Sequence, residues 1–172
     1  MSNFFTVKKK IGSFNKIISV NGDKSLSIRW VLLSSLANGI SEAKNLLMSE
    51  DVLAAIKVKL NNNICKIYGR GINGYKYKNN LILNAENSGT LGRLLLGLII
   101  NSTKVIKLTG DKSLSKRDFK RVTDPLSKFG ADFILKDNHG LPLKIKGAEN
   151  LKPIVYEENK GSAQCKSSII FA

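Results

Sequence analysis

Histidine and cysteine are scarce in this sequence. Its 172 residues include one histidine, His139, and two cysteines, Cys65 and Cys165. The cysteines lie far apart and form no CxxC pair, which argues against a zinc site or a disulfide framework, and we expect both to be reduced thiols. A catalytic triad would depend on His139, which lies in an Asn-His-Gly turn. We therefore predict no metal site and no histidine-dependent hydrolysis.

Long apolar runs and nucleotide-binding loops are also missing. No stretch approaches the roughly 20 apolar residues that cross a bilayer, and no apolar run of signal-peptide length follows the basic residues near the N-terminus. Neither GxxxxGK[ST] nor GxGxxG occurs. The basic turn at residues 69–71 is interpreted as a surface hairpin rather than a phosphate loop. We expect a cytoplasmic protein that does not act at a membrane.

Positive charge, by contrast, is abundant. Lysine and arginine total 28 against 13 acidic residues, a formal net charge of +15. Such an excess favours an anionic partner, which could be nucleic acid, acidic lipid or phosphorylated metabolites. A compositional bias of the source is a competing explanation, since lysine and asparagine both occur in runs. Aromatic residues make up 7% and are not interleaved with basic residues on a β-face, so a basic nucleic-acid-binding module is kept only as an alternative.

Length and hydrophobic pattern predict one α/β domain. With 42% hydrophobic residues, the chain is long enough to bury one domain core. Short β-like runs alternate with amphipathic segments of helical periodicity. We expect strands at residues 16–20, 64–68, 81–83, 105–108, 132–135 and 143–145. We expect helices from about 23–25 to 39, at 50–60, from about 90 to 99, and at 115–129, the last closing at Gly130.

An internal repeat is the most informative feature. The octapeptide Gly22–Arg29 returns as Gly110–Arg117 with seven of eight positions identical, and each copy follows a β-like run. Gly-Asp-Lys-Ser at a helix start combines free backbone N–H groups, the positive end of the helix dipole, a hydroxyl and an ammonium group. Arg29 lies four residues after Ser25 and can share a helix face with it. A lone copy is better read as an ordinary cap, but two equivalent copies favour an anion site.

Two further segments repeat this logic with other residues. Asn87–Thr90 precedes a helix that carries Arg93 on its first turn, and the glycine within this segment lets a ligand approach the backbone. Gly161–Ser167 offers hydroxyl, amide and ammonium groups at the start of an apolar helix that reaches Ala172 without a cap. Taken separately, the first could be an ordinary turn and the second a plain N-cap. The uncapped end leads us to expect that the sequence stops inside a helix.

These four motifs, in this order, resemble those of the enolpyruvyl transferase family. The resemblance runs from about Lys16 to Ala172 and also includes residues 46–51, 108–111, 141–143 and Gly147. Lys24-Ser25 with Arg29 is similar to the 5-enolpyruvylshikimate-3-phosphate synthases, whereas UDP-N-acetylglucosamine enolpyruvyl transferases open with a Gly-Ala-Lys-Asn type of motif. A relative of the latter enzymes remains an alternative.

The resemblance implies a transferase of the shikimate pathway, in aromatic amino-acid and chorismate biosynthesis. Such an enzyme moves the enolpyruvyl group of phosphoenolpyruvate to the 5-hydroxyl of shikimate 3-phosphate and releases phosphate. No metal or organic cofactor is implied, and the full-length protein is expected to be a monomer. A glycine at position 89 is expected to leave room for the herbicide glyphosate.

The resemblance also implies which residues hold each substrate. Those expected to contact shikimate 3-phosphate are Lys24, Ser25, Arg29, Ser162, Ala163 and Gln164. Those expected to contact phosphoenolpyruvate are Lys24, Asn87, Gly89, Thr90, Arg117 and Gln164, with Gln164 between the two substrates. Arg93 is a motif position without an assigned contact. Asp118 is a departure, because the family usually has Pro after Arg117, and the added carboxylate either weakens anion binding or points to solvent.

The family fold has two lobes, each of three βαβαββ units that together form an inside-out α/β barrel. The resemblance implies that residues 1–172 are one incomplete enolpyruvyl transferase domain. Residues 1–13, with a strand near 4–8, would pair with the missing lobe, and residues 14–172 would form the first lobe, truncated in its third unit. The proton-transfer groups belong to the second lobe, so no catalytic residue is expected here and the fragment is expected to be inactive alone.

Overall fold

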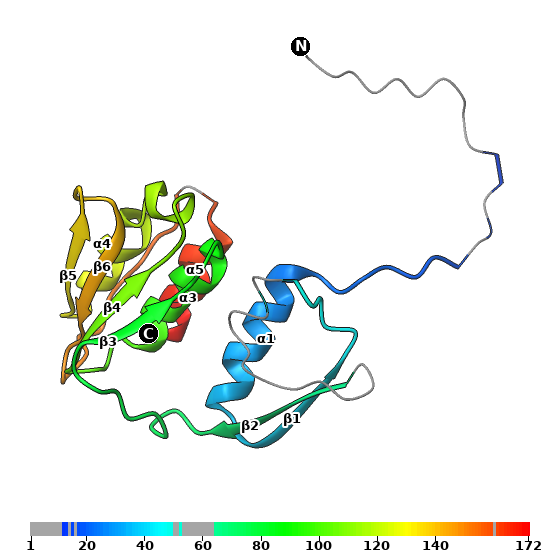
Figure 1. Ribbon diagram of the computed structural model, residues 1–172, viewed down its shortest axis with the longest axis horizontal. Coiled ribbons are helices and arrows are strands. Elements are labelled where there is room, and N and C mark those ends of the chain that lie inside the picture. Colours follow the sequence, from blue (N-terminus) through cyan, green and yellow to red (C-terminus); the bar gives the residue numbers. More distant parts are fainter. Residues whose placement is uncertain (1–11, 14, 16, 50–51, 53–63, 160) are drawn as a thin grey trace, which may run out of the picture.

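A computed structural model describes residues 12–13, 15, 17–49, 52, 64–159 and 161–172. Two groups of elements follow one another along the chain (Figure 1). Helix α1 and a two-stranded sheet come first, and a four-stranded sheet with its helices follows. The expected α/β class is confirmed, and no helix among the described residues is long and apolar enough to cross a membrane.

The second group is a complete βαβαββ unit. Its elements are β3 (Leu81–Asn84), α3 (Gly89–Leu98), β4 (Val105–Thr109), the short 3₁₀ turn η1 (Leu114–Lys116) with α4 (Lys120–Ser127), β5 (Asp132–Lys136) and β6 (Gly140–Lys146). The strand order is β3-β4-β6-β5, with β3 parallel to β4 and the other pairs antiparallel. The unit expected from the resemblance is therefore present once in full.

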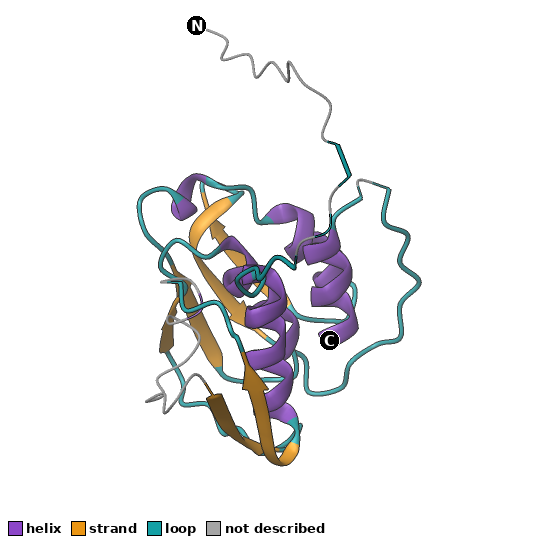
Figure 2. Ribbon diagram, turned by 90° about the vertical axis from the view of Figure 1, so that its right-hand side faces the viewer, coloured by secondary structure: helices purple, strands orange, loops and turns teal. Residues whose placement is uncertain are grey.

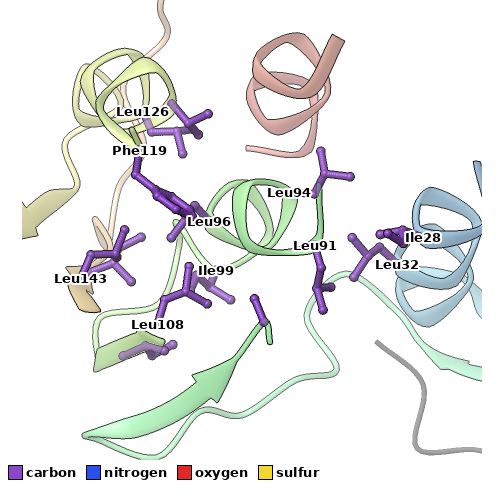
Figure 3. Close-up of a cluster of buried hydrophobic side chains, with 14 of the residues drawn as sticks. Ile28, Leu32, Leu91, Leu94, Leu96, Ile99, Leu108, Phe119, Leu126 and Leu143 are labelled. Atoms are coloured by element: carbon purple, nitrogen blue, oxygen red, sulfur yellow. The ribbon is translucent and has the colours of Figure 1, made fainter. Parts of the chain in front are cut away.

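Helix α3 is the centre of the hydrophobic core. Its sequence is rich in leucine, and Leu91, Leu94 and Leu96 are at most 2% exposed. Figure 3 shows Leu91 and Leu94 on the side of α3 nearer Ile28 and Leu32 of α1, with Leu94 pointing toward the neighbouring helix α5 (Ala163–Phe171), while Leu96 lies on the side of Phe119. Burial on several sides of this helix accounts for its mostly apolar sequence, in which Thr90 and Arg93 near the N-terminus are the polar residues.

The first group is smaller and packs through α1. Helix α1 (Lys24–Leu36) contacts β2 (Ile64–Arg70), and β2 pairs antiparallel with β1 (Asn38–Lys44). The last helix, α5 (Ala163–Phe171), lies beside α3 and also contacts α4. Figure 2 shows the helices lying together on one side of the strands.

Five of the six expected strands are confirmed, and the sixth is wrong. Residues 17–20 form no strand, and Ile17, Ile18 and Val20 are at least 74% exposed. Their β-branched composition favours a strand, but an isolated strand leaves its backbone unpaired, and no strand of the described chain lies beside them. Strand β1 was not expected, since Asn, Gly, Ser, Glu and Lys are weak strand formers, and it exists through its pairing with β2.

Two of the expected helices differ from those in the structure. The expected end of the first helix at Gly39 is wrong: α1 ends at Leu36, and Asn38 and Gly39 pair in β1 instead of capping the helix. Gly130 follows α4, as expected, with a φ of 104°. The continuous helix expected at 115–129 is wrong: Arg117 is extended, with ψ 147°, and the Phe119 backbone N–H donates to the His139 carbonyl at 2.8 Å. This bond to the β5–β6 turn and the burial of Phe119 replace helical continuation.

Three other expectations concern particular segments. The strand near 4–8 and, apart from Val52, the helix at 50–60 lie outside the described residues. The basic segment at 69–71, expected to be a surface hairpin, lies at the end of a strand of the β1–β2 pair. Gly69 and Arg70 belong to β2, paired with Gly39 and Asn38 of β1.

Candidate anion-binding site

The two copies of the octapeptide fold into the same turn. Asp23 accepts a hydrogen bond from the Leu26 N–H at 2.7 Å, and Asp111 accepts one from the Leu114 N–H at 2.6 Å. An aspartate side chain that satisfies a backbone N–H three residues on is an N-cap of the usual kind. The first copy begins the long α1 and the second only the one-turn η1. The expectation that each copy starts a helix is thus confirmed for α1, and is limited to one turn at the second.

Lys24 and Ser25 occupy the first two positions of α1, with Arg29 one turn farther along. Arg29 reaches across to α5: its Nε donates to the Ser167 hydroxyl at 3.1 Å and its Nη2 donates to the Ala163 carbonyl at 3.4 Å. The structure therefore brings the first repeat to the N-terminal end of α5, which we call the mouth of that helix.

The mouth of α5 also contacts the mouth of α3. The Gln164 amide donates from Nε2 to the Thr90 hydroxyl at 2.9 Å and accepts at Oε1 from Arg93 Nη1 at 2.9 Å. Because both halves of the amide have partners, its orientation is fixed. Ala163 and Gln164 are consecutive, so neighbouring residues of α5 contact Arg29 on one side and Arg93 on the other.

Several contacts hold the Arg93 side chain in place. Its Nη2 donates to the Asp118 carbonyl at 3.1 Å, and its guanidinium lies over the Phe119 ring, 5.0 Å from the centroid. The carbonyl of Arg93 in turn accepts from the Ser168 hydroxyl of α5 at 2.8 Å. Partial burial lowers the pKa of Arg93, and the positive charge of Arg117 lowers it as well. Like charges held together in this way favour an anion between or beside them.

Gly89 lies where these arginines meet. A Cβ at this position would lie 2.8 Å from Arg93 Nη1 and 3.1 Å from Arg117 Nη1. Arg117 itself is exposed, and among the described residues no acidic side chain forms an ion pair with it or with Arg93. Gly89 is buried beneath these two side chains. An exposed guanidinium at a helix start has the charge and the donors to bind a phosphate or carboxylate.

The position of Asp118 determines whether its carboxylate offsets the positive charge of Arg93 and Arg117. Its Oδ1 accepts from the Lys120 backbone N–H at 2.8 Å, at the start of α4, and the residue is exposed. The carboxylate therefore serves a local turn, and its carbonyl, rather than its side chain, contacts Arg93. The Asp118 carboxylate is exposed, yet its negative charge acts to raise the pKa of Arg93, so it offsets part of the positive charge of the arginine cluster.

Asn87 and Asp111 join the α3 mouth to the second repeat. Asp111 Oδ2 accepts from Asn87 Nδ2 at 2.5 Å, and the Asp111 backbone N–H donates to the Glu86 carbonyl at 2.8 Å. The hydrogen bond from the Leu114 N–H lowers the pKa of Asp111, and the one from Asn87 adds to this. The carboxylate thus stabilises the turn that leads to Arg117 when it is ionised.

Asp111→Asn is expected to lower stability at neutral pH. A depressed folded-state pKa contributes stability that is present above the unfolded value of about 3.9 and is lost as the pH falls through the folded-state pKa. Chemical denaturation of the chain should therefore show a wild-type advantage at pH 7 that shrinks as the pH falls below about 3.9. Asp132→Asn, at an exposed position of β5, is the control. A difference between wild type and Asp111→Asn that stays constant with pH would contradict this role.

Several contacts were not foreseen from the sequence. The roles of Ser167, Ser168 and the Asp111 carboxylate depend on which helices touch, and nothing in the local pattern identifies them. A repeat-based comparison could have found Asp111, since it matches Asp23. Ser162 is the N-cap of α5, accepting from the Cys165 N–H at 3.2 Å. Within the described residues, no group of three His, Cys, Asp or Glu side chains could hold a metal ion.

The sequence matches one protein family and its curated members. Residues 8–172 match the family model described as EPSP synthase (3-phosphoshikimate 1-carboxyvinyltransferase). A 3-phosphoshikimate 1-carboxyvinyltransferase of Caldicellulosiruptor bescii is 43% identical over 167 residues, covering 92% of this chain and 38% of the relative. One of Desulforamulus reducens is 42% identical over 176 residues, covering 96% of this chain and 40% of the relative.

Solved structures agree with these sequence comparisons. An EPSP synthase from Acinetobacter baumannii superimposes with a TM-score of 0.82 at 34% identity, covering 90% of this chain and 37% of that one. The chain spans about two fifths of the length of the curated relatives that it matches, at 38% and 40%.

Proposed function

Since the chain belongs to the EPSP synthase family, we propose that it forms the substrate-binding first lobe of a 3-phosphoshikimate 1-carboxyvinyltransferase. In this reaction the 5-hydroxyl oxygen of shikimate 3-phosphate gives up its proton and bonds to C2 of phosphoenolpyruvate. The bond from C2 to the phosphate oxygen breaks, and phosphate leaves with that oxygen and the bonding electron pair. The products are 5-enolpyruvylshikimate 3-phosphate and phosphate. The observation that carries the proposal is the α5 mouth, where consecutive residues contact Arg29 and Arg93.

We assign shikimate 3-phosphate to the side of this site next to α1. Arg29 has a guanidinium whose plane is set by partners on two helices, and a guanidinium can bind a carboxylate or phosphate through two parallel hydrogen bonds. Lys24 and Ser25 add an ammonium group and a hydroxyl at the positive end of the α1 dipole. Ser162, Ala163 and Gln164 complete this side from the start of α5.

Phosphoenolpyruvate is assigned to the side next to α3. Its phosphate would lie against Arg117, next to the start of α3 at Gly89 and Thr90, which are buried, with Asn87 exposed at the edge and Lys24 between the substrates. Gln164 is fixed by Thr90 and Arg93, so it offers the two substrates a rigid boundary. The charge that leaves with phosphate is stabilised here by groups already in place, which is how preorganised electrostatics lowers a barrier.

The rest of the proposal follows the family. The chain contributes binding, orientation and positive charge, and no residue in it is assigned to proton transfer. Those groups are proposed to lie in the portion of the relatives that this chain does not cover. We propose that the enzyme works in the cytoplasm as a monomer, without a metal or organic cofactor.

The test is phosphate release by the gene product, expressed from its complete reading frame. Release is expected only when both phosphoenolpyruvate and shikimate 3-phosphate are present, because neither substrate alone completes the transfer. A gene product that releases no phosphate with both substrates would show the proposed function to be wrong. Substituting UDP-N-acetylglucosamine for shikimate 3-phosphate tests the related transferase activity, and no turnover is expected with it.

The 172-residue chain alone is expected to release no phosphate under the same conditions. It supplies charged ligands for the substrates but none of the assigned proton-transfer groups, and proximity effects require the complete site. The same assay measures this, with the gene product as the positive control. Steady product formation by the chain alone would contradict the division of roles.

A further inference from the structure

Ser167 of α5 has no place in the substrate assignments above, yet it contacts the main shikimate 3-phosphate ligand. Arg29 Nε donates to its hydroxyl oxygen at 3.1 Å. Two backbone carbonyls accept from the other guanidinium nitrogens of Arg29: Ser25 from Nη1 at 3.2 Å and Ala163 from Nη2 at 3.4 Å. Ser167 is therefore the one side chain among the described residues that holds this guanidinium by a hydrogen bond.

The direction of the Ser167 hydroxyl is set by a second bond. Its Oγ donates to the Ala163 carbonyl, four residues earlier on α5, at 2.8 Å. A hydroxyl has one proton and two acceptor lone pairs, so donation to Ala163 leaves the oxygen as an acceptor toward Arg29. The three groups form a closed arrangement in which Ala163 accepts from both Ser167 and Arg29.

This arrangement determines what Arg29 can offer a ligand. A guanidinium is planar and has five N–H donors. The Nε donor and one donor from each terminal nitrogen are directed to protein oxygens, which leaves one donor on each terminal nitrogen. The bond at Nε fixes the plane of the group, and a fixed plane is what two-point binding of a carboxylate or phosphate requires.

We propose that Ser167 is a positioning residue for Arg29 and thereby sets the affinity of the site for shikimate 3-phosphate. This inference rests on the proposed function, because Arg29 must be a ligand of that substrate. Ser167 does not itself touch the substrate in this scheme. Its effect belongs to binding, so it should alter KM for shikimate 3-phosphate and leave the chemical step alone.

The simplest competing role is local. A serine hydroxyl bonded to the carbonyl four residues earlier is common in helices and has little consequence for function. Ser127 supplies a matched control, since its hydroxyl donates to the Asp124 carbonyl at 2.8 Å, on an exposed part of α4. Loss of that bond removes a similar helix contact but no arginine partner.

The experiment compares Ser167→Ala, Ser167→Thr and Ser127→Ala in the gene product by steady-state kinetics with both substrates. Ser167→Ala is expected to raise KM for shikimate 3-phosphate by about tenfold, the order expected for a hydrogen bond to a charged group, with kcat and KM for phosphoenolpyruvate unchanged. Ser167→Thr keeps the hydroxyl and should restore wild-type KM, and Ser127→Ala should match wild type.

The possible failures are distinguishable. A wild-type gene product that does not turn over shikimate 3-phosphate overturns the proposed function, and this inference with it. An active wild type whose KM for shikimate 3-phosphate is the same in Ser167→Ala overturns the inference alone. A Ser167→Ala variant that changes kcat or both KM values equally, without rescue by threonine, shows a general structural role and also overturns it.

Discussion

Replacing Arg117 by alanine is expected to weaken phosphoenolpyruvate binding by about a hundredfold. The guanidinium is exposed and approaches the point where a Cβ on Gly89 would lie, at 3.1 Å. A hydrogen bond to a charged group contributes about 1.5–3 kcal/mol, and each 1.4 kcal/mol is a factor of ten. Arg93 cannot offer the same two-point binding through its terminal nitrogens, because Nη1 donates to both Gly89 and Gln164 and Nη2 donates to Asp118, which leaves no free donor on Nη1.

The measurement is the KM for phosphoenolpyruvate of the gene product at saturating shikimate 3-phosphate. Arg117→Lys keeps the charge but loses two-point binding, so its KM should fall between those of wild type and Arg117→Ala. Salt dependence gives a second readout, since part of the attraction to a dianionic ligand is screened by ions.

Arg121 provides the matched control for net charge. It is an exposed arginine on α4, and its positive charge lowers the pKa of Arg93, as that of Arg117 does. Arg121→Ala removes the same charge from the same neighbourhood without removing a group beside Gly89. Its KM for phosphoenolpyruvate should change by less than about threefold, in keeping with a screened surface charge. Equal losses in the Arg121 and Arg117 variants would mean that general positive potential, rather than Arg117, attracts the substrate.

The sequence predicted best those features that a short segment determines by itself. Local signals were sufficient wherever one segment determines its own structure: Asp23 and Asp111 both cap turns, and Ser88 and Ser162 both cap helices. These signals depend on residues three positions apart, which a sequence displays directly. The family resemblance then gave the order of the four motifs a common purpose.

What the sequence could not supply are features that depend on partners far along the chain. The break before Phe119 depends on the His139 carbonyl, and β1 depends on pairing with β2. The residues at 17–20 show the converse: their composition favours a strand, but composition provides no neighbouring strand. The bonds from Arg29 to Ser167 and from Arg93 to Gln164 likewise span 138 and 71 positions. Contacts of this kind follow from the packing of α5 against α1 and α3.

That packing depends on a close approach at Gly97 of α3. A Cβ built on Gly97 would lie 2.1 Å from the Ser168 carbonyl oxygen and 2.9 Å from its carbonyl carbon, both in the backbone of α5. Backbone atoms inside a helix cannot rotate away as a side chain does, so the two helices would have to separate. Since α5 carries Gln164 and Ser167, any such shift also moves the partners of Arg93 and Arg29.

Gly97→Ala is therefore expected to lower the free energy of unfolding by about 3 kcal/mol, at the upper end for overpacked cores. For a chain of this size, that corresponds to a fall in Tm of about 6–12 °C. Circular dichroism during thermal and urea denaturation of the chain measures both quantities. KM for both substrates should rise in the gene product at temperatures where it remains folded, because the α5 mouth contacts both arginines.

Gly92→Ala is the matched control, because it makes the same substitution in the same helix. Its Cβ would lie 3.4 Å from Ala85 Cβ and from the Phe119 ring, an ordinary van der Waals contact. Alanine in a helix interior is favoured over glycine by about 0.5–1 kcal/mol, so this variant should be as stable as wild type or slightly more so. If Gly97→Ala and Gly92→Ala had the same Tm, α5 would have to shift relative to α3 at no cost in stability. The assignment of one substrate to each side of the α5 mouth would then lose its structural basis, because that assignment depends on a fixed α5.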